Sequence, residues 1–247
     1  MSTLAKGAAL LASAALLGVV WASPWGSPAA ARSAAGQPAE GLGAMQAPIA
    51  HISQEEETPL PAEVAVPIRQ GRTALRAVKS SVQQRRYAAA LRSIRVVGWK
   101  VARAHEAGMA QIGAPPTDPE SDDPPGPPSV IAVLNFEHAV TAQFVPLFAN
   151  LRKTLVVRAL GSTLASAHRV RDEMLDAVIA LDPEEEGADY ADGMADTLPI
   201  YTAEVAAIRK ALNRYRLSPT GRVALRAALV RARATLVKVN AAFGGGE

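Results

Sequence analysis

The fold is decided by residues 218–246, which read SPTGRVALRAALVRARATLVKVNAAFGGG. Ser218 is a residue type that caps helix N-termini, Pro219 suits a first helical turn, and the glycine run from Gly244 suits a helix end. Between these signals, apolar residues return every three or four positions and form one helical face: Leu225, Leu229, Ala232, Leu236, Val239 and Phe243. Because such a face must be buried, the segment predicts an α-helix that packs against other helices.

Two long stretches upstream repeat this helical period. Residues 72–112 carry apolar side chains in steps of three or four and predict a helix up to about 60 Å long, which we expect to break or to project beyond its neighbours. Residues 129–160 carry a second stripe, which continues in phase through Pro146. This continuity favours one helix kinked at the proline over two separate helices.

Shorter patterns complete the expected fold. Gly161 and Ser162 indicate a turn, which is followed by an expected helix over residues 163–181 and by another around residues 201–215. No stretch alternates apolar and polar residues between hairpin turns, so no strands are expected. The sequence therefore predicts an all-α fold, a bundle of about five amphipathic helices.

Residues 1–31 have the features of an export signal. Lys6 precedes the uncharged apolar block of residues 7–22, GAALLASAALLGVVWA, and small residues suited to signal-peptidase cleavage end at Ala22 and at Ala31. We expect cleavage after Ala31, because a cut after Ala22 leaves almost no polar spacer behind the block. The block has 16 residues, fewer than the ~18 of a comfortable membrane span, so an uncleaved anchor is the alternative. We therefore expect a periplasmic, secreted or cell-envelope protein.

Segments rich in proline, glycine or acidic residues divide the rest of the chain. Residues 32–67 combine proline, alanine and glycine with no sustained apolar period and predict a flexible tether. The helical bundle is expected over residues 68–243, interrupted by a Pro-rich acidic linker at 113–129 and an acidic loop at 182–196. Residues 244–247 form a short tail.

The composition excludes several classes of site. The chain has no cysteine, which rules out disulfides, thiolate metal sites, C-x-x-C-H haem attachment and a cysteine nucleophile. It also lacks a G-x-S-x-G turn, a Walker phosphate loop and a dinucleotide-binding fingerprint. No catalytic constellation is recognisable, and we expect a protein that is not an enzyme.

Charge is segregated along the chain in a way that indicates a binding surface. Residues 69–103 hold ten bases and no acid, residues 209–238 hold nine bases, and residues 172–196 hold ten acids and no base. Two basic helices can bind a polyanion or anionic lipid headgroups. Alternatively, the acidic loop lies over the basic helices and neutralises them, while arginine stems cover the edge of the core. The candidate binding residues are Arg72, Arg76, Lys79, Arg86, Arg92, Arg95, Arg222, Arg226 and Arg233.

Three histidines are the candidates for a metal or haem site inside the bundle. His105 and His138 each lie on the apolar side of an expected helix. His168 and Asp172, four residues apart, share one helical face. Together with nearby carboxylates, these side chains can ligate zinc, iron or haem iron if the fold brings them together. Against this, the Glu-x-x-His pairs of ferritin-like di-iron bundles are absent from the sequence, and each histidine is also explained as a packed or capping side chain.

These observations lead to two expectations of different classes. The first is an exported, non-enzymatic helical bundle that binds a protein partner, an anionic envelope polymer or a membrane surface through its arginine-rich helices. Nucleic acid is not an expected target of an exported chain. The second is a metal- or haem-binding bundle that uses the core-facing histidines. An exposed arginine face that no acidic segment covers would favour the first, and three converging histidine rings would favour the second.

Overall fold

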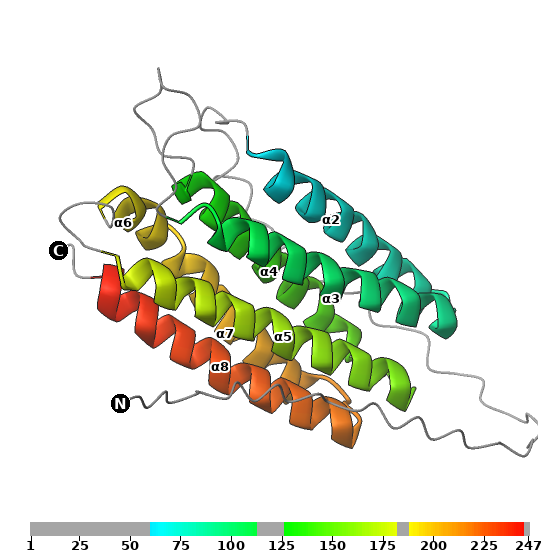
Figure 1. Ribbon diagram of the computed structural model, residues 1–247. Helices are drawn as coiled ribbons and strands as arrows, with labels where there is room; N and C mark the ends of the chain where they lie inside the picture. Colours follow the sequence, from blue (N-terminus) through cyan, green and yellow to red (C-terminus); the bar gives the residue numbers. More distant parts are fainter. Residues whose placement is uncertain (1–59, 113–125, 182–187, 245–247) are drawn as a thin grey trace, which may run out of the picture. The chain divides into compact units, whose positions relative to one another are not determined.

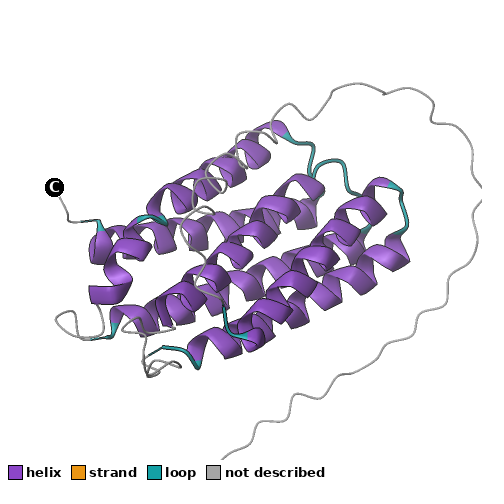
Figure 2. Cartoon of the chain, turned by 90° about the horizontal axis from the view of Figure 1, so that it is seen from above, coloured by secondary structure: helices purple, strands orange, loops and turns teal. Residues whose placement is uncertain are grey.

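The computed structural model describes residues 60–112, 126–181 and 188–244 (Figure 1). In these residues all regular structure is helical, as Figure 2 shows, so the expected all-α bundle is confirmed. The helices are α2 (Ala62–Gln83), α3 (Tyr87–Met109), α4 (Gly126–Leu147), α5 (Thr154–Ile179), α6 (Ala188–Ala195), α7 (Leu198–Arg214) and α8 (Pro219–Phe243). The expected export signal and most of the expected tether lie outside the described residues.

Helix α4 is the central element of the bundle. Helices α2, α3, α5, α6 and α7 all pack against it, while α8 packs against α5, α6 and α7. In Figure 1 the long helices lie side by side with their axes along a common direction. Among the described residues, α4 is the one helix long and apolar enough to cross a membrane, and 61% of its apolar window is buried inside the bundle. The central position accounts for this composition, because a helix surrounded by others is apolar on nearly all sides.

One apolar cluster joins these helices. Its largest buried side chains include Phe136, Phe144 and Phe148 of the α4 region, together with Leu75 of α2. Helix α2 approaches α4 closely at Gly71, where an added Cβ atom would overlap the ring of Phe136. The packing of α2 on α4 therefore requires a residue without a side chain at this position.

The helix that decided the fold class is α8, and its predicted ends are confirmed. It begins at Pro219, and the Oγ of the N-cap residue Ser218 accepts a hydrogen bond from the Gly221 N–H at 3.2 Å. It ends at Phe243, directly before Gly244. Local capping chemistry and the glycine run were therefore sufficient to place both ends of this helix.

The long segment over residues 72–112 breaks, and its two parts pack as a helical hairpin. Helix α2 ends at Gln83 and α3 begins at Tyr87. Arg85 in the turn has a φ of 58°, and the N–H of Arg86 donates to the Ser81 carbonyl at 2.8 Å. This arrangement resembles the helix ending that glycine usually makes in the left-handed region. Because an arginine takes that position here, no glycine marks the turn in the sequence.

The prediction of one kinked helix over residues 129–160 is wrong. Helix α4 ends one residue after Pro146, and α5 begins at Thr154. Asn150, in the connection, has a φ of 59°, which helical residues do not adopt. The apolar stripe stays in phase across the break because the connection is itself packed into the core, with Phe148 buried.

The turn predicted at Gly161 and Ser162 is also wrong. Helix α5 runs through both residues without interruption, from Thr154 to Ile179. A Cβ atom on Gly161 would lie 3.0 Å from the Cβ of Ala224 on α8. Gly161 therefore allows α5 and α8 to approach each other closely, which a sequence pattern does not distinguish from a turn.

Segments predicted to be irregular contain helix at their edges. Helix α2 includes Pro67, which the sequence placed in the tether. Helix α4 begins at Gly126, so Pro127 and Pro128 of the expected linker lie in its first turn, where the missing N–H has no helical partner to lose. Helix α6 occupies Ala188–Ala195 within the expected acidic loop. The predicted tether, linker and acidic loop therefore each include residues that are helical.

Candidate functional site

A buried ion pair joins α5 and α7 in the middle of the bundle. The guanidinium of Arg171 donates through Nη1 to both carboxylate oxygens of Glu204, at 3.0 Å each, and neither side chain is exposed. Nη2 of Arg171 donates to Thr235 Oγ1 of α8 at 2.9 Å, and Thr235 donates in turn to Asp172 Oδ1 at 2.8 Å. The pair thus links three helices through charge-assisted hydrogen bonds.

Two of the candidate histidines contact the same carboxylate. His138 Nδ1 of α4 lies 3.3 Å from Glu204 Oε2, and His168 Nε2 of α5 lies 3.1 Å from Glu204 Oε1. His168 Nε2 also lies 3.1 Å from Thr141 Oγ1. Glu204 is therefore the centre of a cluster in which one guanidinium and two imidazole rings, from α4 and α5, contact the same carboxylate.

Burial and charge fix the ionisation of this cluster. Burial opposes the charged form of Glu204, but Arg171 and the hydrogen bonds from the two histidines outweigh it and hold the Glu204 pKa well below its usual value. Burial also disfavours charge on Arg171, but Glu204 reverses the effect and raises the Arg171 pKa. Burial lowers the pKa of His168. At neutral pH the cluster therefore holds a charged Arg171–Glu204 pair beside a neutral His168.

Glu137 is a second buried carboxyl group beside this cluster, and it lacks compensation. Among the described residues, neither of its side-chain oxygens has a hydrogen-bond partner. Burial raises the Glu137 pKa well above its usual value, with Arg171 opposing that rise. The neutral form of Glu137 is therefore favoured, and the group destabilises the fold rather than supporting it.

The structure brings together two of the four residues named as metal ligands. His105 lies on α3, with its Nε2 3.5 Å from Glu173 Oε2, and Asp172 accepts the hydrogen bond from Thr235. In the part of the chain that the structure describes, no group of three or more histidine and acidic side chains could hold a metal ion. At Glu204 the guanidinium of Arg171 already supplies the positive charge that a metal would supply. This geometry gives the metal- or haem-binding hypothesis little support.

The candidate binding residues are, by contrast, mostly at the surface. Eight of the nine are exposed, and Lys79 is partly buried. Within the described ranges, none of the nine forms an ion pair, and Arg76 donates only to the neutral Thr73 hydroxyl at 3.3 Å. Two other bases of these segments do form ion pairs: Arg103 pairs with Glu106, and Lys238 pairs with Asp176. The residues 182–187 of the expected acidic loop lie outside the described residues.

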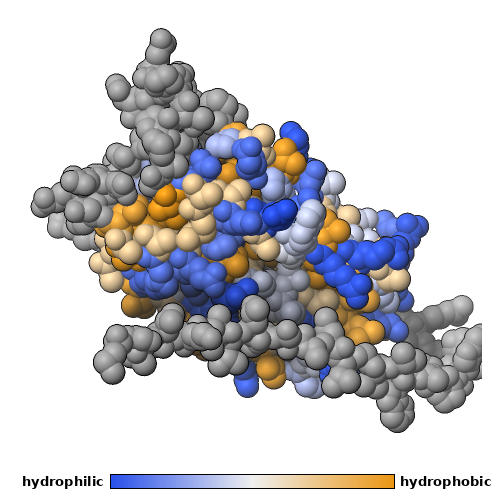
Figure 3. All heavy atoms as spheres, viewed as in Figure 1, coloured by the Kyte–Doolittle hydropathy of each residue, from blue (hydrophilic) through white to orange (hydrophobic). Residues whose placement is uncertain are grey.

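The outer side of α3 combines these unpaired bases with a tryptophan. We define the α3 face as the exposed side chains that one side of this helix presents: Arg92, Arg95, Val96, Trp99 and Arg103. Of its three arginines, Arg103 is paired with Glu106, and Arg92 and Arg95 are unpaired among the described residues. Trp99 is 56% exposed, and Lys100 Nζ lies 4.0 Å from the centre of its ring. Large aromatic side chains are usually buried, so an exposed one beside cations is a feature of binding surfaces. On the side of the molecule drawn in Figure 3, hydrophilic and hydrophobic residues are interspersed.

Sequence reasoning missed both the ion pair and Trp99. Arg171 is in phase with the apolar residues Leu164 and Leu175 of α5, and Glu204 is in phase with Ile208 of α7. A charged residue on the apolar side of a helix was therefore the available signal for a buried pair. For Trp99, the signal was its place among arginines on the polar side of α3.

Comparisons with protein families, curated proteins and solved structures found no match to this chain.

Proposed function

We propose that the protein is an exported, non-enzymatic helical bundle that binds an anionic envelope component through the α3 face. The observation that carries the proposal is Trp99, half exposed on the same side of α3 as Arg92 and Arg95, which no described carboxylate neutralises. The proposal that the chain is exported rests on the apolar block and cleavage sites of residues 1–31.

Chemistry favours an anionic surface as the ligand of this face. Arginine guanidinium groups bind phosphate and carboxylate groups through paired hydrogen bonds, and each basic residue near an anionic membrane contributes about 1 kcal/mol. Tryptophan partitions to the boundary between water and lipid headgroups. The exposed arginines of α2, Arg72 and Arg76, add positive charge on the neighbouring helix of the hairpin.

A vesicle-binding experiment tests this proposal. Protein lacking residues 1–31 is mixed with vesicles of phosphatidylglycerol and phosphatidylcholine, because the apolar block would itself enter lipid. We expect co-sedimentation at about 50 mM salt that falls steeply by about 500 mM, since salt screens exposed charges. Pure phosphatidylcholine vesicles are the control, and a soluble anionic polymer tests the polymer source of the same chemistry. Equal binding at both salt concentrations, or no binding to any anionic probe, would contradict the proposal.

A further inference from the structure

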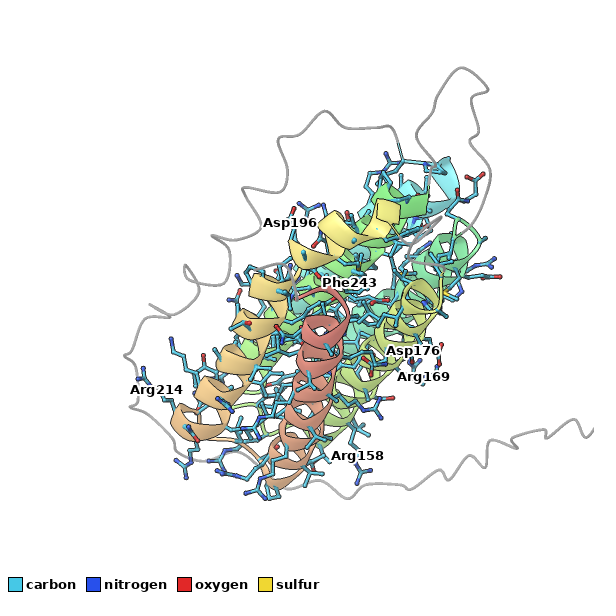
Figure 4. All side chains as sticks on the ribbon, turned by 90° about the vertical axis from the view of Figure 1, so that its left-hand side faces the viewer. Arg158, Arg169, Asp176, Asp196, Arg214 and Phe243 are labelled. Atoms are coloured by element: carbon cyan, nitrogen blue, oxygen red, sulfur yellow. The ribbon has the colours of Figure 1, made fainter. Side chains whose placement is uncertain are left out.

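The outer side of α8 carries an apolar stripe that no described element covers. Val223, Val230 and Val237 are exposed to 67%, 68% and 69%, although valine is usually buried. Three alanines, also exposed, alternate with them along the helix: Ala227, Ala234 and Ala241. Figure 4 shows α8 with α7 and α5 on either side. The exposure of these six residues places them on the side of α8 away from the core.

The spacing of the stripe suits a second helix. Its positions follow steps of four and three, which is the spacing of the apolar seam between two helices in a coiled coil. The alanines between the valines would also allow a second helix to pack closely on α8, because small side chains let two helix axes come near each other. We call these six residues the α8 stripe.

A groove beside the stripe adds room for a large side chain. It lies between α5 and α8 and has a volume of about 280 Å³. Its floor and walls are mainly apolar and include Leu164 and Gly161 of α5 together with Val223 and Ala227 of the stripe. Arg158 and Arg231 also line it. A leucine or phenylalanine side chain of a docked helix would pack into this apolar groove, close to the two arginines.

The charges beside the stripe decide which partner fits. Arg222, Arg226 and Arg233 are exposed and, within the described ranges, unpaired, and residues 205–246 contain no acid. Two copies of α8 would therefore bring like charges together. A lipid surface matches the charge but gains little from valine and alanine, which lack the aromatic and long apolar side chains of interfacial helices.

We propose that the α8 stripe docks an acidic amphipathic α-helix of a partner protein, with apolar residues against Val223, Val230 and Val237 and carboxylates against the flanking arginines. The site lies on a different helix from the α3 face, and α5 packs between α3 and α8. The two surfaces are therefore separable by mutation.

The test uses the full chain and a labelled peptide of about four heptads, with leucine at the a and d positions and glutamate at e and g. We expect saturable binding by fluorescence anisotropy. Val230→Asp should weaken it about tenfold or more, because a carboxylate would enter the middle of an apolar seam. Leu155→Asp is the matched control: it makes the same apolar-to-acidic change at an equally exposed residue of α5, outside the α8 stripe and the α3 face, and should leave affinity within about twofold.

A scrambled peptide of the same composition separates helix docking from general attraction to positive charge, and it should bind at least about tenfold more weakly. Equal affinity of wild type and Val230→Asp for the heptad peptide, or equal binding of the scrambled peptide, would overturn the proposal. So would a wild-type dimer, or vesicle binding, that Val230→Asp abolishes and Leu155→Asp retains, since a second copy or a lipid surface would then be the occupant. Circular dichroism of each variant verifies that it is folded.

Discussion

Through Nη1, the Arg171 guanidinium donates hydrogen bonds to both oxygens of the Glu204 carboxylate, at 3.0 Å each, inside the bundle. Two histidines also contact Glu204, while Arg171 also contacts Thr235 and lies over the ring of Tyr201. Because both charges are fully buried, removing either partner would leave the other charge buried without compensation.

Glu204→Gln should destabilise the protein by about 3–5 kcal/mol, because it leaves the Arg171 charge buried without its counterion. Urea unfolding followed by circular dichroism measures the change. Asp176→Asn is the control, since it removes the carboxylate of the exposed Lys238–Asp176 pair and should cost under about 1 kcal/mol. Similar losses of stability in the two variants would show that the buried pair contributes no more to stability than the exposed one.

Glu137→Leu should have the opposite effect and stabilise the protein by about 1–3 kcal/mol, because it removes a buried carboxyl group without a hydrogen-bond partner among the described residues. Burial raises the folded-state pKa of Glu137, so the folded state holds its proton at a pH where the unfolded state has lost it. The protein therefore loses stability through Glu137 as the pH rises above the pKa that this group has in the unfolded state. The gain in Glu137→Leu should be larger at pH 7 than at pH 4, and unfolding curves at both values test it. A destabilised variant would contradict the account of Glu137.

His168 contributes a pH dependence of the other sign. Burial lowers its pKa, so as pH falls below the ordinary histidine value of 6.5 the unfolded state binds a proton that the folded state does not. The free energy of unfolding of the wild type should therefore decrease through His168 as the pH falls from 7 to 5. His168→Gln should show a smaller loss than wild type over this range in urea unfolding. An unchanged pH dependence would mean that folding does not lower the His168 pKa, and it would contradict this account.

Two glycines in neighbouring helices should respond oppositely to alanine. At Gly71 the new Cβ would overlap the Phe136 ring, so Gly71→Ala should destabilise the protein by about 1–3 kcal/mol. At Gly98 of α3 the nearest atoms, on Thr163, lie at an ordinary contact distance of 3.6 Å. Gly98→Ala should therefore stabilise the protein by about 0.5–1 kcal/mol through helix propensity. Thermal unfolding of both variants tests the close packing of α2 on α4.

The elements that sequence reasoning placed correctly are those with local signals. Ser218, Pro219 and the glycines after Phe243 bounded α8 because caps and helix breakers act on neighbouring backbone groups. The errors at Gly161 and Asn150 have a different cause: both depend on what packs against the chain from elsewhere, which no local pattern records. His138 and His168 were correctly placed in the interior, but their shared partner Glu204 is distant in sequence and could only be found from the fold.

The central claim, that the α3 face binds an anionic surface, is tested most directly by the fluorescence of Trp99. In protein lacking residues 1–31, Trp99 is the sole tryptophan, because Trp21 and Trp25 are removed. Anionic vesicles should shift its emission to shorter wavelength, and the double variant Arg92→Glu, Arg95→Glu should weaken vesicle binding about tenfold or more. The matched double variant Arg222→Glu, Arg226→Glu on α8 should retain both the shift and most of the affinity. An unshifted Trp99 emission in the presence of bound vesicles, or equal losses in the two double variants, would contradict the claim.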